Sequence, residues 1–166
     1  MGITAPDMLN DEHILSTFSC SNQALDDWLL KQAIKSQKKN NAKVYVVTDS
    51  ETAQVVGYYA IAMGSVQREN ATAPLRRNSP NPIPMVVLAR LAVDKKYHGK
   101  GIGAGLLKDC VRRSVHAMNV VGGAGILVHA IDASAKTFYT KFGFSESNFD
   151  QMTLMASIRD IEKAKN

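Results

Sequence analysis

The sequence predicts a single α/β domain that covers residues 1–166. The length is that of one domain with a buried core, and a hydrophobic content of 45% is ordinary for a globular protein. Apolar runs of strand character alternate with helical patterns along the chain. The clearest unit is Val86 to Leu107, where a β-branched strand (Val86–Val93), a glycine-rich loop and a helix follow one another.

Before this unit, several elements are expected. Ile3–Leu9 predicts an edge strand, because Pro6 fits only an edge or an end, and Asp11–Phe18 predicts a short helical turn. Ser21 is the expected N-cap of a helix over 22–37. Lys43–Thr48 and Val55–Met63 predict two strands, and Gly57 in the second indicates a bulge or a close approach.

The stretch from Gly64 to Pro84 shows no regular pattern. Prolines at positions 80, 82 and 84 exclude a helix there and favour an extended loop. A loop this long in a compact domain is usually functional. Because it ends where the Val86–Val93 strand begins, we expect Arg76 and Arg77 to lie beside the functional site that this strand helps to form.

After the central helix, the chain predicts a compact C-terminal part. The expected elements are strands at Ala124–His129 and Met152–Ser157, a helix at Ala133–Phe142 stopped by Gly143, an extended segment from Phe144, and a charged tail from Arg159 that is helical or frayed.

Composition limits the class of protein. Twenty Lys and Arg against 15 Asp and Glu give a formal charge of +5, which favours a polyanionic partner. No apolar run approaches the roughly 20 residues that span a bilayer, and the N-terminus lacks a signal-peptide pattern. We therefore expect a cytoplasmic protein without membrane contact. Cys20 and Cys110 are expected as buried thiols, with a disulfide or a catalytic thiol as the lesser alternatives.

The glycine-rich loop, His98 to Gly105, suits a phosphate. Glycines let the backbone approach a ligand, and the first N–H groups of the following helix point outward with partial positive charge. A nucleotide P-loop needs Gly-Lys-Ser/Thr, but Leu106 follows Gly105. The glycine spacing also differs from the dinucleotide fingerprint. A plain strand–helix connection is the remaining alternative from the residues alone.

The segment His98-Gly99-Lys100-Gly101-Ile102-Gly103 resembles the Gln/Arg-x-x-Gly-x-Gly/Ala loop of the GNAT N-acetyltransferases, with His98 in the Gln/Arg position. The resemblance implies a mixed, mostly antiparallel sheet of six to seven strands, flanked by helices and splayed at the acetyl-CoA site between Val86–Val93 and Ala124–His129. It implies acetyl-CoA as cosubstrate, no metal, and cofactor contacts from Leu91, Ala92, Val93, His98, Gly99, Lys100, Gly101, Ile102, Gly103, Ala104, Asp132 and Phe138.

Ala133 to Phe144 resembles the last conserved block of that family, and Tyr139 aligns with the tyrosine that protonates the departing thiolate. The chemistry requires such a group, because collapse of the tetrahedral intermediate expels a charged sulfur. A packing tyrosine is the alternative. Asp132 stands near the position of a family asparagine that contacts pantetheine.

A narrower resemblance covers almost the whole chain. It is to the acetyltransferase toxins of bacterial type II toxin–antitoxin modules, the TacT/AtaT-like group, and it is carried by Gly57-Tyr58-Tyr59, Gly64-Ser65-Val66, Leu75-Arg76-Arg77-Asn78, Pro82-Ile83-Pro84, Leu88–Asp94, Val128-His129-Ala130 and Phe138-Tyr139. It implies acetylation of the α-amino group of aminoacyl-tRNA, which blocks translation. It also implies a ribbon-helix-helix antitoxin, operator DNA bound through that antitoxin, and a homodimer.

The strand Val86–Val93 contains no Asp or Glu, where many relatives have a carboxylate base. A lysine amine has a pKa near 10.4, whereas a free α-amino group has one near 7.7–8.0, and the ester of aminoacyl-tRNA lowers it further. Such an acceptor needs little or no base. His129 is either a base or water holder, or a packed and hydrogen-bonded strand histidine.

The basic residues gather in a few segments: Lys31, Lys35, Lys38, Lys39, Arg76, Arg77 and Arg90. We expect Lys31, Lys35, Arg76, Arg77 and Arg90 to contact RNA phosphates, which would give affinity without sequence choice. A solvated basic face, and an ion-pair role for Arg90, are the alternatives.

The leading hypothesis is therefore an acetyl-CoA-dependent N-acetyltransferase of aminoacyl-tRNA. Two alternatives stay open at this point. One is an acetyltransferase of a small amine or a protein N-terminus, and the other is a non-catalytic module that binds coenzyme A or nucleic acid.

Overall fold

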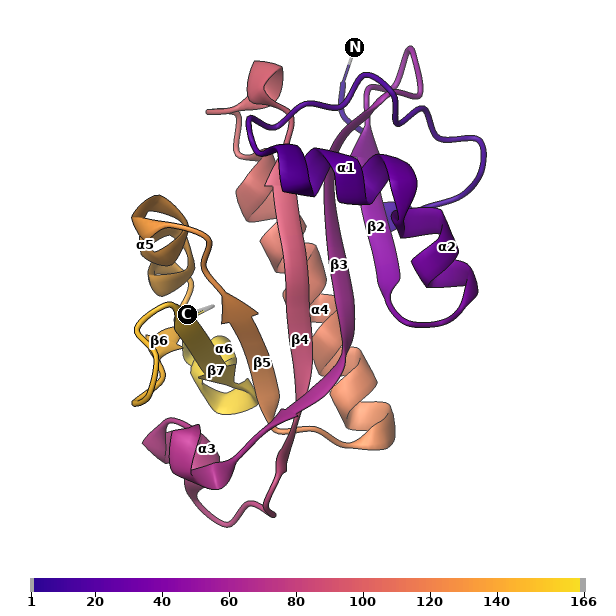
Figure 1. Ribbon diagram of the computed structural model, residues 1–166. Helices are drawn as coiled ribbons and strands as arrows, with labels where there is room; N and C mark the ends of the chain where they lie inside the picture. The colour runs from indigo at the N-terminus through magenta and orange to yellow at the C-terminus, as the bar shows by residue number, and fades with distance from the viewer. Residues whose placement is uncertain (1, 165–166) are drawn as a thin grey trace. The chain divides into compact units, whose positions relative to one another are not determined.

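The computed structural model describes residues 2–164. Seven strands form one mixed sheet in the order β1-β2-β3-β4-β5-β7-β6 (Figure 1). The strands are β1 Asp7–Met8, β2 Lys43–Thr48, β3 Val55–Val66, β4 Ile83–Val93, β5 Gly125–His129, β6 Ser145–Glu146 and β7 Thr153–Ser157. The helices are α1 Gln23–Lys31, α2 Ala33–Lys38, α3 Ala73–Arg76, α4 Ile102–Val121, α5 Ala133–Lys141 and α6 Ile158–Ala164, with short 3-10 turns η1 Arg68–Asn70 and η2 Lys95–Tyr97.

The chain forms two compact units. Unit 1 comprises Met1–Ala62 and Ala89–Cys110, and unit 2 comprises Met63–Leu88 and Val111–Asn166. Strands β3 and β4 and helix α4 each contribute residues to both units.

In unit 1, antiparallel β1, β2 and β3 carry the helices α1 and α2. The β2–β3 register runs from Lys43 opposite Ile61 to Thr48 opposite Val55. Leu29 of α1 and Ala33 of α2 pack into the same apolar cluster as strand residues that include Val44, Val46 and Tyr58. Burial of that apolar face stabilises the two helices, which are too short to persist alone.

The structure places Gly57 at both features that a strand glycine can mark. The β2–β3 register shifts between Val47 and Thr48, beside Gly57, as a bulge does. A Cβ on Gly57 would lie 3.0 Å from Leu106 and 3.3 Å from Ile102, so the strand lies close to the first turns of α4. The expected bulge and close approach are both confirmed.

The first helical region differs from the prediction. Asn22, not Ser21, is the N-cap, and its side chain accepts a hydrogen bond from Leu25 N at 3.1 Å. Ser21 has φ 74, outside the extended conformation that an N-cap adopts. The single helix expected over 22–37 is two helices, which meet at Gln32.

In unit 2, β4 pairs in parallel with β5 from Met85–Gly125 to Leu88–Val128. Antiparallel β7 then follows β5, and β6 follows β7. One face of these strands packs on α3 in a cluster that includes Leu75, Met85, Leu127 and Met155. Helix α4 is the crossover that connects the parallel strands β4 and β5.

Four further expectations differ in detail from the structure. The loop over 64–84 contains η1 and α3. Pro74 is compatible with α3 because it lies in the first turn, where a backbone N–H has no acceptor within the helix. Strand β4 begins at Ile83, and Pro84 takes part as an acceptor from Ala124 N at 2.9 Å. Residues 11–18 form turns rather than a helix, and β1 is shorter than Ile3–Leu9.

The remaining strands and helices lie where they were expected, within a few residues at their ends. Among the helices of residues 2–164, none combines the length and the apolar character that a bilayer crossing requires.

Candidate active site

Asp94 fixes the chain where β4 gives way to the glycine-rich loop in unit 1. Its carboxylate accepts hydrogen bonds from Lys96 N at 2.9 Å and from Ser19 N at 3.0 Å, and Asp94 is buried. Its own N–H donates to Val56 O at 2.8 Å. These bonds begin the η2 turn at a fixed position, so the loop that follows leaves the strand in one direction.

The loop backbone lies open at two glycines. Gly99 has φ 77 and Gly101 has φ 79, values that residues with a Cβ rarely adopt. No atom lies within 4 Å of the point where a Cβ would stand at either position. An approaching phosphate can therefore reach the main chain directly.

The beginning of α4 supplies the donors for such a phosphate. The first helical hydrogen bond runs from Gly105 N to Gly101 O at 3.0 Å. The N–H groups of Ile102, Gly103 and Ala104 precede this ladder and have no acceptor within the helix. Together with the helix dipole they form a site suited to an anion, so the loop fits a pyrophosphate.

Side chains of the loop hold it in place. His98 Nε2 donates to Val93 O at 2.8 Å, and the Lys100 ammonium lies 5.4 Å from the centre of the Tyr97 ring. Leu91, Ala92 and Val93 form the last residues of β4, with Ala92 buried. The loop, its helix and the end of β4 thus come together in unit 1.

Tyr139 belongs to unit 2, on α5. It is 6% exposed, and its ring meets Phe138 at 5.2 Å and Phe144 at 5.8 Å in edge-on contacts. Gly143, at φ 94, ends the helix and lets Phe144 turn back to the tyrosine. Asp132 is the N-cap of the same helix and accepts from Ala135 N at 2.8 Å.

His129 ends β5, and its side chain is exposed although the rest of that strand is buried. Its Nδ1 lies 2.9 Å from Thr153 Oγ1, and the Thr153 hydroxyl donates to Asp150 Oδ2 at 2.9 Å. The strand histidine is thus hydrogen-bonded, as one alternative expected, but it is not packed away from solvent. Thr153 and Asp150 carried no signal of their own in the sequence.

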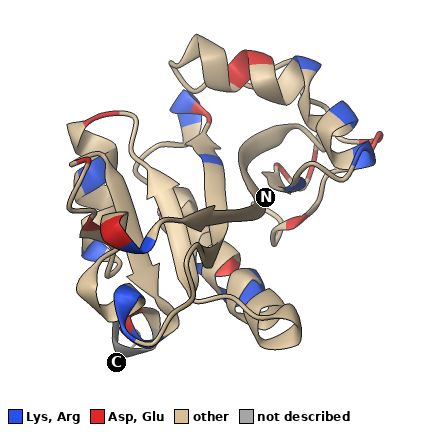
Figure 2. Cartoon of the chain, turned by 60° about the horizontal axis from the view of Figure 1, so that its bottom comes forward, with Lys and Arg blue, Asp and Glu red and all other residues tan. Residues whose placement is uncertain are grey.

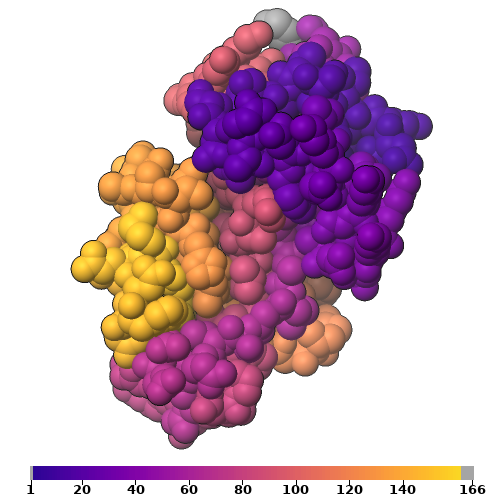
Figure 3. Space-filling model, viewed as in Figure 1, coloured from indigo at the N-terminus to yellow at the C-terminus, as the bar shows by residue number. Residues whose placement is uncertain are grey.

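Four basic residues of unit 1 belong to the α1–α2 segment or follow it directly; that segment is drawn in indigo to purple in Figure 3. Lys31, Lys35, Lys38 and Lys39 are all exposed, and they are among the blue residues of Figure 2. Lys31 Nζ lies 3.9 Å from Asp27 Oδ1, and Lys38 Nζ lies 3.6 Å from Asp11 Oδ1. Exposed pairs of this length contribute little and leave the cations available to another anion.

The three candidate arginines differ in their contacts. The Arg90 guanidinium lies 4.3 Å from the centre of the Trp28 ring in a cation–π contact. Arg76 is half-buried, and its Nη1 donates to Ala71 O at 2.9 Å. Arg77 is exposed. Arg90 belongs to unit 1 and the other two to unit 2.

Residues 2–164 contain no group of three or more His, Cys, Asp or Glu side chains arranged to hold a metal ion. Cys110 is buried, whereas Cys20 is only partly so. Burial and a hydrogen bond with Asp26 raise the pKa of the Cys20 thiol to about 11. A protonated thiol is a poor nucleophile, so this environment does not favour a catalytic cysteine.

Comparison with known proteins agrees with this geometry. The model of the acetyltransferase (GNAT) domain matches residues 40–146. A tRNA-acetylating toxin of Mycobacterium tuberculosis (strain ATCC 25618 / H37Rv) is 38% identical over 159 residues, which are 96% of this chain and 95% of that protein.

Two solved structures of the toxin AtaT are also similar. AtaT complexed with acetyl-methionyl-tRNAfMet superposes with a TM-score of 0.90 at 26% identity, over 99% of this chain and 100% of that one. An AtaT mutant bound to the C-terminus of the antitoxin AtaR and acetyl-CoA gives 0.82 at 27% identity, over 99% and 98%. The resemblance read from the sequence is confirmed, and the chain belongs to the GNAT acetyltransferase family.

Proposed function

We propose that this protein is a toxin of a type II toxin–antitoxin module that transfers the acetyl group of acetyl-CoA to the α-amino group of aminoacyl-tRNA. The observation that carries the proposal is the similarity to a tRNA-acetylating toxin over 96% of the chain. The acetylated amine can no longer attack a peptidyl ester, so translation stops. A small amine or a protein N-terminus is the alternative acceptor.

The glycine-rich loop is the proposed cofactor site. Backbone N–H groups from Gly99 to Ala104 would hold the pyrophosphate, and the positive φ of Gly101 keeps that backbone accessible. Main-chain groups of Leu91, Ala92 and Val93, with Phe138 and Asp132, would hold the pantetheine arm. Asp132 already serves as a helix cap through one oxygen, and its contact to the cofactor would use the other.

Tyr139 is the proposed general acid. When the amine nitrogen bonds to the thioester carbon, the carbon–sulfur bond breaks and the sulfur needs a proton, which the phenol supplies. The ring is buried and makes edge contacts with Phe138 and Phe144, which hold it in place. Strand β4 contains no carboxylate, which agrees with an acceptor amine of nearly neutral pKa.

The basic residues are the proposed tRNA contacts. Lys31 and Lys35 are exposed on α1 and α2, Arg77 is exposed after α3, and Arg90 is partly exposed beside Trp28. Arg76 keeps further N–H groups besides the one that Ala71 accepts. Such contacts bind phosphates without choosing a sequence, so binding should weaken steeply with salt.

The proposal includes the setting of the enzyme. Residues 1–166 act as one acetyltransferase domain in the cytoplasm, where charged tRNA and acetyl-CoA occur together. Its regulator is a ribbon-helix-helix antitoxin, which brings the toxin to operator DNA and makes the pair a repressor. Homodimerisation completes the proposal and is supported by the resemblance to the TacT/AtaT-like group.

The deciding experiment is acetyl transfer from labelled acetyl-CoA to total charged tRNA, with deacylated tRNA as the control. Label on charged tRNA alone is the expected result, and sequencing the labelled fraction then names the isoacceptors. Label on neither pool, with acetyl-CoA still bound by the protein, would favour the small-amine or protein acceptor instead.

A further inference from the structure

A chain of three hydrogen-bonded side chains lies at the C-terminal end of β5. It joins His129, Thr153 and Asp150 through the two 2.9 Å contacts at the Thr153 hydroxyl. His129 and Thr153 are direct partners in the antiparallel β5–β7 pair, so their side chains stand on the same face of the sheet. The chain begins at a carboxylate and ends at an exposed imidazole.

The direction of these bonds determines which imidazole nitrogen is basic. A threonine hydroxyl has a single proton, and Thr153 donates it to Asp150. Thr153 Oγ1 must therefore accept from His129, which places the proton of the neutral imidazole on Nδ1. The other nitrogen, Nε2, then carries a lone pair and can take up a proton.

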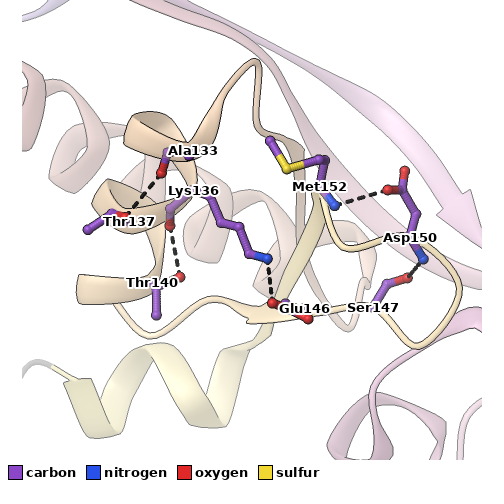
Figure 4. A network of polar contacts seen from close by, with 8 residues as sticks. All are labelled: Ala133, Lys136, Thr137, Thr140, Glu146, Ser147, Asp150 and Met152. Carbon is purple, nitrogen blue, oxygen red and sulfur yellow. Dashed lines mark hydrogen bonds and ion pairs between the residues drawn. The ribbon is translucent and has the colours of Figure 1, made fainter.

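The β6–β7 loop is built to hold Asp150 as an ion. Its Oδ1 accepts from Met152 N at 2.9 Å, and its own N–H donates to the Ser147 hydroxyl at 3.2 Å (Figure 4). Ser147 is buried, and its N–H donates to Thr153 O at 2.8 Å. The hydrogen bonds from Met152 and Thr153 hold the pKa of Asp150 below its usual range, so the carboxylate stays an acceptor near neutrality.

The position of His129 in unit 2 shows on which face of the sheet its imidazole lies. The parallel pairing of β4 and β5 ends at Leu88 and Val128, and His129 is the next residue. Leu127 and Met155 alternate with His129 and Thr153 on one sheet face, and they pack with Leu75 of α3. His129 therefore lies on the sheet face that carries α3, which ends at Arg76 and is followed by Arg77.

The β6–β7 loop also contacts the segment before α3, because Asn148 Nδ2 donates to Glu69 O at 3.0 Å. In unit 2, the His129 imidazole, the Asp150 carboxylate and the segment that ends in Arg77 thus belong to the sheet face that carries α3 or to loops that contact that segment. If that segment binds the phosphates of the acceptor, the amine of the acceptor comes to the same side.

We infer that His129 Nε2 accepts the proton of the acceptor's α-ammonium group, with Thr153 and Asp150 as positioning residues. The inference rests on the proposed function for the identity of the acceptor. Nε2 removes one proton, and the freed nitrogen lone pair bonds to the thioester carbon as the carbon–sulfur bond breaks. The nitrogen then loses a second proton, which replaces the proton that the Tyr139 phenol gives to sulfur, and His129 releases its own extra proton to solvent.

Few charges surround the imidazole. They are Asp150 and, on the described parts of the elements that contact β7, Lys136 and Lys141 of α5, Glu146 of β6, Arg76 of α3, and Arg159 and Asp160 of α6. Lys136 forms an ion pair with Glu146. Strand β5 contains no other titratable residue, and β7 contains none. The pH dependence of the step should therefore reflect the imidazole and the substrate amine, whose pKa lies at or below 7.7–8.0.

The kinetic test compares wild type with His129→Gln, Thr153→Val and Thr153→Ser, measuring kcat/KM for aminoacyl-tRNA between pH 6 and pH 8.5. His129→Gln should be about 10-fold slower at pH 6 and within about twofold of wild type at pH 8.5, where the amine is already neutral. Thr153→Val should show the same pH-dependent loss more weakly, and Thr153→Ser should restore the rate. An equal loss at every pH would reduce His129 to a structural role and overturn the inference.

The second readout needs no substrate. Nitrogen-15 NMR of the imidazole should show the Nδ1–H tautomer in wild type and a loss of that preference in Thr153→Val. An Nε2–H tautomer in wild type would also overturn the inference. If wild type acetylates another amine but not charged tRNA, the proposed acceptor is wrong, and the same pH series with that amine tests His129.

Discussion

The Nε2 atom of His98 lies 2.8 Å from the carbonyl oxygen of Val93, so the first residue of the glycine-rich loop is bonded back to the last residue of β4. Between them lies the η2 turn, which Asp94 caps. A loop closed in this way has little freedom before any ligand arrives, and a site that is already ordered loses less entropy on binding. The family usually has Gln or Arg where this chain has His98.

His98→Ala should weaken acetyl-CoA binding by roughly 3- to 10-fold, since it removes a hydrogen bond worth about 0.5–1.5 kcal/mol in ordering the loop. His98→Gln keeps a side-chain donor and should bind within about twofold of wild type. Isothermal titration calorimetry with acetyl-CoA measures both variants. Equal affinity for the alanine variant and wild type would show that the His98–Val93 bond does not organise the site.

Gly101→Ala should destabilise the fold by about 1–2 kcal/mol, because the backbone at φ 79 is strained for any residue with a Cβ. No atom lies within 4 Å of the added methyl, so backbone strain alone accounts for the loss. Gly105→Ala is the matched control, since its Cβ is equally uncrowded and it lies within α4, where alanine is favoured by about 0.5–1 kcal/mol.

The free energy of unfolding of the two alanine variants, measured with a chemical denaturant, shows whether backbone strain at Gly101 or any substitution in this region lowers stability. The strain account requires opposite signs, with Gly101→Ala less stable than wild type and Gly105→Ala at least as stable. A loss of stability of the same size in both would contradict it.

Tyr139→Phe should lower turnover by about 10²- to 10⁴-fold while acetyl-CoA binding stays close to wild type. The phenylalanine ring keeps the edge contacts to Phe138 and Phe144, so packing is preserved and only the hydroxyl is lost. Single-turnover kinetics and a binding titration on the same preparation separate the two effects. Turnover within a few-fold of wild type would leave Tyr139 with a packing role alone.

The elements that periodicity determines were predictable from the sequence. β2 is a short run of β-branched and aromatic residues and was predicted at the bounds it has, and the apolar residues of α4 recur at steps of three and four, as in a helix. The glycine-rich loop was predictable too, because its glycines and the following helix are adjacent in the chain. Asn22 was missed because Ser21 beside it is an equally good cap residue, and only the backbone conformation distinguishes them.

What depends on strand register was not predictable. Thr153 meets His129 only because β7 pairs with β5 in one register, and a shift of one residue would turn the hydroxyl to the other face. The contact of Arg90 with Trp28 likewise joins residues 62 positions apart. Charge counts identified Arg76 and Arg77 together, but only the structure separates a half-buried side chain from an exposed one.

Cys20 should react with iodoacetamide about 100-fold more slowly than an ordinary thiol at pH 8, because a pKa of about 11 against 9.0 lowers the thiolate fraction by two orders of magnitude. Burial is the main cause of the raised pKa, and the nearby Asp26 carboxylate adds to it. Mass spectrometry follows the labelling, with the protein unfolded in urea as the control. Labelling of the folded protein at the rate of the unfolded one would show that this environment does not protect Cys20.

Arg77→Ala should make the plot of log K for tRNA binding against log salt shallower by about one unit, because one phosphate contact with its released counterion is lost. Arg77 is exposed, so the fold should keep its stability. Arg76→Ala differs, since it also removes the bond to Ala71 O and should cost about 1 kcal/mol of stability. Lys108→Ala, an exposed lysine of α4 outside the proposed contacts, is the matched control and should leave the slope unchanged. An unchanged slope in Arg77→Ala, or an equal change in Lys108→Ala, would mean that net charge rather than this segment attracts the tRNA.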